Sequence, residues 1–277
     1  MQAFAERLEA VVDARGALCV GIDAHPASLA KWGLADDAAG LEAFSRGLVE
    51  ALAGRVAVFK PQSAFFEAQG PAGLSALSRT LRDVAAAGAL SILDVKRGDI
   101  GSTMAAYARA YLADGAELAA DAITVSPFLG FEALQPAVDL AAATGRGLFA
   151  LARTSNPEGA EVQLAVSPDA GGTVAQHVVA GAAAANRRAG TPLVGLVIGA
   201  TLAKLDVDLD GFDGWILAPG IGAQGAEMTH LAELFGARPA RVLPTVSRSI
   251  ADVGPAAPAL RDAVARAVAG WNAGYAG

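Results

Sequence analysis

The sequence predicts an α/β protein, a single-domain (β/α)8 TIM barrel that spans residues 1–277. Eight short apolar runs alternate with alanine-rich amphipathic segments along the chain. The repeat averages about 35 residues, which is the period of the β-α units in such barrels. No G-x-G-x-x-G fingerprint follows the first run, and this argues against an open doubly wound sheet, the alternative fold.

The apolar runs have the composition of strands that are buried on both faces. Parallel strands covered by helices consist of nearly continuous hydrophobic residues, without a regular polar alternation. The predicted strands are Leu18–Ile22, Val56–Lys60, Leu90–Val95, Ala122–Ser126, Gly147–Ala152, Leu193–Ile198, Gly214–Ala218 and Arg241–Val246.

The segments between these runs have the residue spacing of amphipathic helices, and prolines lie at several of their borders. The unit after the sixth strand leaves little room for a helix. Residues 153–172, after the fifth strand, form a long irregular connection of a kind that often serves function. The predicted helices are Leu41–Ala53, Gly73–Ala87, Ser102–Leu112, Phe131–Ala143, Thr173–Ala189 and Gly225–Phe235.

Composition excludes several classes of protein. A chain that is 53% hydrophobic and 18% charged can bury a large core, and the single cysteine, Cys19, excludes a disulfide framework. His25, His177 and His230 lack the spacing of metal ligands, so we expect no metal. The net charge of −7 argues against nucleic-acid binding. Without a signal peptide or a membrane span, we expect a cytoplasmic protein.

Charged side chains collect where the predicted strands end. Asp23 follows the first strand, Lys60 ends the second, and Asp94 and Lys96 lie two apart at the third, so that they point to the same side. In a barrel these ends form one mouth, where active sites lie. An array of alternating charges keeps each group ionised and supplies an ammonium as a proton donor. A carboxylate facing a bound anionic group favours decarboxylation, whereas a structural ion-pair cluster is the alternative.

The ends of the seventh and eighth strands indicate a phosphate site. Gly220, Gly222 and Gly225 can turn backbone N–H groups toward an anion, and a helix starting near Gly225 would direct its positive end there. Arg248 can bind two phosphate oxygens at once. Barrels often hold phosphate after strands seven and eight. The alternative is a glycine turn beside a surface arginine.

Six motifs occur in order along nearly the whole chain: V-G-I-D at 20–23, V-F-K-P at 58–61, D-V-K-R-G-D-I-G-S-T at 94–103, A-R-T-S-N-P at 152–157, A-P-G-I-G-A-Q-G at 218–225 and S-R-S-I at 247–250. With them the chain resembles the orotidine 5′-monophosphate decarboxylase family, and within it the longer bacterial subgroup. The resemblance implies decarboxylation of orotidine 5′-monophosphate to uridine 5′-monophosphate and CO2, in pyrimidine biosynthesis, without a metal or organic cofactor.

The resemblance also implies roles for the motif residues. Lys96 would protonate the ring carbon after CO2 leaves, and Asp94 would lie against the substrate carboxylate. Lys60 would complete the array and bind ribose hydroxyls together with Asp23. The resemblance further implies a homodimer with shared active sites, in which the partner subunit contributes Asp99, Ile100 and Thr103. The remaining substrate-binding residues would be Ser155 at the pyrimidine edge, Gln224 and Arg248 at the phosphate, and Pro219.

Two other functions remain open on the residues alone. A related barrel could act on a sugar phosphate through a metal-stabilised enediolate, which would need an additional carboxylate ligand near Asp94. The sequence offers no strong candidate for it, since Glu67 lies past the second strand. A non-catalytic phosphate-binding protein would keep Arg248 and the glycine loop, but it would not need both Lys60 and Lys96.

Overall fold

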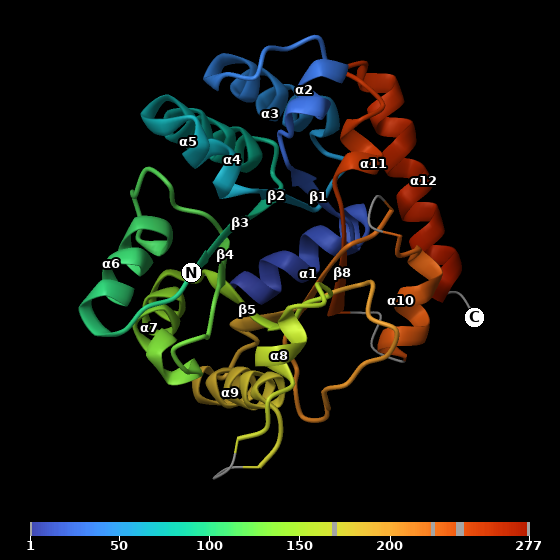
Figure 1. The fold of residues 1–277 in the computed structure, drawn as a ribbon. Helices are drawn as coiled ribbons and strands as arrows, with labels where there is room; N and C mark the ends of the chain where they lie inside the picture. Colours follow the sequence, from blue (N-terminus) through green and yellow to red (C-terminus); the bar gives the residue numbers. More distant parts are fainter. Residues whose placement is uncertain (1, 168–170, 223–224, 237–240, 276–277) are drawn as a thin grey trace.

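The computed structural model describes residues 2–167, 171–222, 225–236 and 241–275. Within them, eight parallel strands form a closed barrel in chain order, which confirms the predicted fold (Figure 1). The strands are β1 (Cys19–Ile22), β2 (Val58–Pro61), β3 (Leu90–Arg97), β4 (Ala122–Val125), β5 (Gly147–Arg153), β6 (Val194–Ile198), β7 (Ile216–Pro219) and β8 (Val242–Val246).

Helices surround the barrel. They are α1 (Phe4–Arg15), α2 (Pro26–Lys31), α3 (Ala38–Leu52), α4 (Ser63–Ala68), α5 (Gly70–Ala86), α6 (Gly101–Leu112), the 3-10 helix η1 (Phe131–Leu134), α7 (Gln135–Thr144), α8 (Gly159–Gln163), α9 (Val174–Ala189), α10 (Met228–Phe235), α11 (Arg248–Ala251) and α12 (Ala257–Tyr275). Among the described residues, no helix has the length and apolarity needed to cross a membrane.

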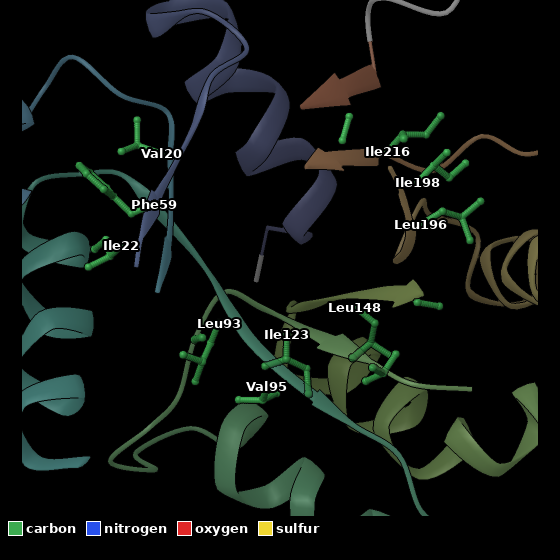
Figure 2. Close-up of a cluster of buried hydrophobic side chains, with 14 of the residues drawn as sticks. Val20, Ile22, Phe59, Leu93, Val95, Ile123, Leu148, Leu196, Ile198 and Ile216 are labelled. Atoms are coloured by element: carbon green, nitrogen blue, oxygen red, sulfur yellow. The ribbon is translucent and has the colours of Figure 1, made fainter. Parts of the chain in front are cut away.

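Side chains alternate between two packing layers along each strand, because successive residues of a strand point to opposite sides. On β1 and β2, Val20 and Phe59 belong to the large outer core, where strands pack against helices (Figure 2). Cys19 and Val58 belong to a second cluster inside the barrel. The next inward positions, toward the carboxyl ends of the strands, are therefore the ones that can supply a site.

Helix α1, which the sequence reading did not predict, packs against the amino-terminal end of the barrel. Phe4 and Leu8 share the inner cluster with strand residues, and the ring of Phe4 meets Phe149 edge to face at 6.1 Å. A Cβ atom at Gly147 would lie 2.3 Å from the Phe4 ring, so only glycine fits there. This helix covers one end of the barrel, and the cavity described below lies at the other.

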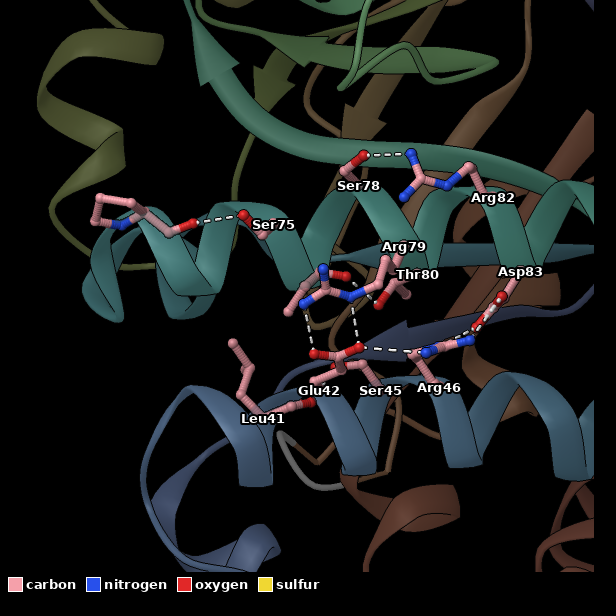
Figure 3. A network of polar contacts seen from close by, with 12 residues as sticks. Leu41, Glu42, Ser45, Arg46, Ser75, Ser78, Arg79, Thr80, Arg82 and Asp83 are labelled. Atoms are coloured by element: carbon pink, nitrogen blue, oxygen red, sulfur yellow. Dashed lines mark hydrogen bonds and ion pairs between the residues drawn. The ribbon is translucent and has the colours of Figure 1, made fainter.

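Ion pairs link α3 and α5 on the surface of the barrel (Figure 3). Glu42 accepts two hydrogen bonds of 2.6 Å from Arg79, and Arg46 binds Asp83 at 2.6 Å. Exposed pairs of this kind contribute about 0–1 kcal/mol each, so the buried apolar faces of the helices supply most of the stabilisation.

Three of the differences from the prediction bear on the site and its rim. β3 continues past Val95 to Arg97, which brings Lys96 into the strand. The helix predicted from Gly225 begins at Met228, because the amides of Gly225 and Ala226 bond to the carbonyls of Gly222 and Gly220 instead of starting a helix. The irregular connection 153–172 contains α8, with residues 168–170 outside the described part. As expected, residues 199–215, which are all described, contain no helix.

Candidate active site

A cavity of about 280 Å³ opens at the carboxyl end of the barrel. Every strand or the loop directly after it contributes to its wall. The lining residues are Asp23, His25, Lys60, Gln62, Asp94, Lys96, Thr124, Leu151, Thr154, Val197, Leu217, Pro219, Gly220, Ile221, Thr245, Ser247 and Arg248.

Four charged side chains of the cavity form a continuous chain of contacts. Lys96 Nζ lies 2.6 Å from Asp94 Oδ1, and Lys60 Nζ lies 2.9 Å from Asp94 Oδ2. Lys60 Nζ also donates a 3.0 Å hydrogen bond to Gln62 Oε1 and lies 3.9 Å from Asp23 Oδ1. Lys60 lies on β2, Asp94 and Lys96 lie on β3, and Asp23 directly follows β1. They occupy the inward positions that follow the buried apolar ones.

Burial and the neighbouring charges shift the pKa values of Lys60 and Asp94 in opposite directions. Burial disfavours the charged Lys60 ammonium, but Asp94 and Asp23 outweigh that penalty and raise the pKa of Lys60 above its usual value. Burial also disfavours the Asp94 carboxylate, yet Lys60 and Lys96 lower its pKa well below the usual 3.8. Both groups are therefore charged at neutral pH. Beneath them, burial raises the pKa of the Cys19 thiol to about 12, so this cysteine is a neutral thiol.

Three other inward positions, on β5, β6 and β7, carry apolar side chains. Leu151 of β5, Val197 of β6 and Leu217 of β7 line the cavity. Since the strands follow chain order around the barrel, these side chains lie across from the charged residues of β1, β2 and β3. The cavity thus has one charged wall and one apolar wall, which suits a flat ring that carries a charged substituent.

Two buried oxygens at the edge of the array have no hydrogen-bond partner among the described residues. They are Asp23 Oδ1 and Ser247 Oγ. Buried polar groups are nearly always hydrogen-bonded, so both oxygens can serve a bound molecule. Arg248 is exposed beside Ser247, at the start of α11, and it lines the same cavity.

The glycine turn after β7 differs from the sequence prediction. Gly220, Gly222 and Gly225 have φ values of 113°, 76° and 96°, which only glycine adopts readily. Gly222 N donates to Ala226 O and Gly225 N to Gly222 O, so these two amides stabilise the turn instead of facing an anion. Gly225 lines a separate surface hollow, and only Gly220 of the three lines the cavity.

The structure brings six of the predicted site residues together in one cavity: Asp23, Lys60, Asp94, Lys96, Pro219 and Arg248. Ser155 lies beside the rim: it does not line the cavity, but its neighbour Thr154 does. The backbone and side chain of Ser155 pack against Gly199 and leave no room there for a Cβ atom. Asp99, Ile100 and Thr103 do not line the cavity of their own chain. Gln224 lies outside the described residues.

Sequence reasoning missed several cavity residues that the strand alternation could have found. His25 and Gln62 lie two residues beyond Asp23 and Lys60, on the same side of the chain. Thr124 and Thr245 are polar residues inside apolar runs, at inward positions, and both are buried. The His25 ring, at the start of α2, meets the Phe65 ring edge to face, with 4.5 Å between the ring centres.

Among the described residues, no three His, Cys, Asp or Glu side chains cluster as metal ligands. Glu67, the candidate ligand for a metal-dependent reaction, is absent from the cavity lining. Its Oε1 accepts hydrogen bonds of 2.6 Å from both Arg97 Nη2 and Ser63 Oγ. This carboxylate therefore holds a surface contact beside β3.

Comparisons with known proteins agree with the motifs. The profile of the "Orotidine 5'-phosphate decarboxylase / HUMPS family" matches residues 16–263. A Streptomyces coelicolor protein named orotidine 5′-phosphate decarboxylase is 55% identical over 96% of both chains, and a Salinispora tropica protein of the same name is 53% identical over 100% of both.

Solved structures give the same result. A crystal structure from Streptomyces avermitilis superposes with a TM-score of 0.94 at 52% identity, covering 100% of this chain and 97% of that one. The Leishmania donovani OMP decarboxylase gives a TM-score of 0.78 at 31% identity, with 99% of each chain covered. The profile match and these identities over the full length show that the chain belongs to the orotidine 5′-phosphate decarboxylase / HUMPS family.

Proposed function

We propose that this protein decarboxylates orotidine 5′-monophosphate to uridine 5′-monophosphate and CO2, a step of de novo pyrimidine biosynthesis. The observation that carries the proposal is the buried Asp94 carboxylate between the Lys60 and Lys96 ammonium groups, opposite an apolar wall. The relatives at 53–55% identity, which match the chain over nearly its full length, carry this activity in their names.

The chemistry follows from placing the pyrimidine ring against the apolar wall with its carboxylate toward Asp94. Two carboxylates placed side by side repel each other, and the repulsion disappears when neutral CO2 leaves. The bond between the ring carbon and the carboxylate breaks, and its electron pair stays on the ring carbon. Lys96 Nζ transfers a proton to that carbon, a new C–H bond forms, and the amine regains a proton from water. Lys60 keeps Asp94 ionised throughout.

Binding energy far from the ring supports this step. Arg248, and Gln224 beyond the described residues, would hold the phosphate. Asp23 and Lys60 would bind ribose hydroxyls, for which the unpartnered Asp23 Oδ1 is available. Ser155 would bind the pyrimidine edge beside Thr154, and Pro219 would line the same site. Interactions of this kind can lower the barrier of the chemical step when they orient the reacting group.

The proposal includes a homodimer in which Asp99, Ile100 and Thr103 complete the partner's site. Ile100 is 62% exposed although it is apolar, and Phe128 and Leu129 are 77% and 53% exposed. These side chains belong to adjoining segments, because Ser126 N donates to Arg97 O and a Cβ at Gly98 would lie 2.1 Å from Ser126 O. Such an exposed apolar patch is typical of an interface between subunits.

We further propose that the reaction needs no metal and takes place in the cytoplasm, without a nucleic-acid partner. Both oxygens of Asp94 are bound by ammonium groups, whose positive charge opposes a divalent cation. Glu67 is engaged elsewhere, so the metal-dependent alternative loses its candidate ligand. The net charge of −7 opposes binding to phosphate backbones. A purely phosphate-binding role would not need both Lys60 and Lys96 bound to Asp94.

The test is the ultraviolet loss of orotidine 5′-monophosphate with purified protein, with and without EDTA. The expected result is rapid loss that EDTA does not change and that Lys96→Ala abolishes. Loss that stops on chelation would refute the metal-free mechanism. Folded protein without turnover would refute the proposed activity, and sugar phosphates with added Mg²⁺ would then be tested.

A further inference from the structure

One hydroxyl group connects the two residues at the centre of the site. Thr124, at an inward position of β4, is 1% exposed. Its Oγ1 donates a 2.8 Å hydrogen bond to Asp94 Oδ1, and the backbone N of Lys96 donates a 2.9 Å hydrogen bond to the same Oγ1. A hydroxyl carries a single hydrogen, so these two bonds assign it: the hydrogen points to Asp94, and a lone pair faces Lys96.

The backbone of Lys96 is unusual. Lys96 is the only non-glycine residue with a positive φ, 47°, in the described part of the chain. Side chains other than glycine are disfavoured in this left-handed region, and residues held there cluster at functional sites. A specific contact is therefore needed to keep the backbone of Lys96 in this conformation.

The pairing between β3 and β4 shifts its register at this point. Leu93 pairs with Ile123, but the next pair is Arg97 with Val125, so four steps along β3 match two along β4. The two extra residues form a bulge that takes the Lys96 N–H out of the regular ladder. The Thr124 hydroxyl accepts the hydrogen bond from that N–H.

The bulge also decides where the ammonium lies. The Lys96 side chain is 46% exposed, so packing alone does not fix it. Its Nζ lies 2.6 Å from Asp94 Oδ1, the same oxygen that accepts from Thr124, while Lys60 holds Oδ2. Thr124 thus contacts Lys96 at its backbone and fixes the carboxylate to which its ammonium is bound.

We propose that Thr124 is the positioning residue for the proton donor: its hydroxyl stabilises the left-handed turn at Lys96 and orients Asp94, and so fixes the ammonium relative to the reacting carbon. This inference rests on the proposed function. Thr124 transfers no proton to the substrate, so its removal affects the chemical step far more than substrate binding.

The test compares variants at one position. Thr124→Val keeps the shape and removes the hydroxyl, Thr124→Ser keeps the hydroxyl, and Thr80→Val is the matched control. Thr80 is also fully buried, but it lies on α5 and donates only to Ala76 O. In Thr124→Val we expect kcat to fall on the order of 10²-fold, with KM within about threefold of wild type. We expect Thr124→Ser to restore most of kcat and Thr80→Val to change neither constant.

Three outcomes would overturn the proposal: wild-type kcat in Thr124→Val, equal losses in Thr124→Val and Thr124→Ser, or a loss confined to KM. If Thr124→Val does not fold, Thr124→Ala removes the same hydroxyl without placing a methyl group against Asp94, and the same loss is expected.

A crystal structure of the valine variant separates this inference from the proposed function. We expect Lys96 to leave the left-handed region and its ammonium to move away from Asp94. An unchanged Lys96 would refute the positioning role, whether or not the wild-type protein decarboxylates orotidine 5′-monophosphate. A wild-type protein without turnover would refute the activity alone.

Discussion

At the scale of the residue, Asp94 and Lys96 are each held in a state that is unfavourable without its neighbours. A carboxylate as buried as Asp94 would be protonated without compensation, but two ammonium groups keep it charged. Lys96 in turn can approach that carboxylate because its backbone adopts a left-handed conformation. The pair is therefore costly to form and is maintained by its surroundings, as is common at active sites.

The proposed role of Lys96 as proton donor predicts a specific loss. We expect Lys96→Ala to lower kcat on the order of 10⁴-fold, because Lys60, the other ammonium of the array, is already bound to Asp94 Oδ2 and Gln62 Oε1. Lys204→Ala is the control, since Lys204 is exposed and does not line the cavity. The measurement is the ultraviolet assay, with circular dichroism to confirm the fold. Turnover retained by a folded Lys96→Ala protein would remove Lys96 from the acid role.

Asp94 predicts a pH-dependent contribution to stability. Its pKa is lowered in the folded state, so its stabilisation is complete above the usual 3.8 and is lost as the pH falls from there through the folded value. At pH 7 we expect Asp94→Asn to lower the free energy of unfolding by about 3 kcal/mol, because Lys60 loses its nearest carboxylate. Urea unfolding measures the difference, which should shrink below pH 4. A constant difference down to the lowest accessible pH would contradict this linkage.

At the scale of the element, α8 holds the rim of the cavity in place. Gln163 Oε1 accepts a 2.9 Å hydrogen bond from Thr154 N, and Gln163 Nε2 donates one of 2.7 Å to Thr154 Oγ1. Arg153, bound to Asp206 at 3.0 Å, donates a 2.6 Å bond to Thr154 O. The long connection after β5 therefore forms a brace of hydrogen bonds around Thr154, the neighbour of Ser155.

This brace predicts an effect on substrate binding. We expect Gln163→Leu to raise KM about tenfold while kcat falls less, because Thr154 and Ser155 lose their fixed position at the rim. Val162→Ala on the same helix is the control, since Val162 is exposed and makes none of these hydrogen bonds. Steady-state kinetics measures both constants. An unchanged KM in Gln163→Leu would show that the rim keeps its position without the brace.

At the scale of the whole molecule, one group of predicted site residues is absent from the cavity lining. Asp99, Ile100 and Thr103 follow β3, but they do not line the cavity of their own chain. The adjoining apolar side chains Ile100 and Phe128 are exposed. Both observations support the proposed homodimer with shared sites, because a twofold interface would bring each segment to the partner's cavity.

Shared sites predict complementation between two inactive variants. In a dimer that pairs an Asp99→Ala chain with a Lys96→Ala chain, one of the two sites has both native residues. A statistical mixture should therefore recover about one quarter of wild-type activity. The measurement is turnover after unfolding and refolding of the mixed chains, with each variant refolded alone as the control. Verified hybrids without activity would contradict the shared-site model.

Much of the fold and part of the site could be predicted from local patterns. Strand runs, helix spacing and the charged residues at strand ends are properties of neighbouring residues, so the barrel and the Asp23, Lys60, Asp94 and Lys96 array were accessible. Helix α1 was missed, because its role depends on contact with Phe149 and Gly147, far away in the chain.

The residues that face the barrel interior follow from the chain alone, because the two-residue period of a strand is a local property. How these residues meet depends on the folded barrel. The register shift between β3 and β4, the left-handed backbone of Lys96 and its bond to Thr124 all depend on strands about 30 residues apart. Contacts of this kind are set by packing and closure of the whole barrel, which no local pattern encodes.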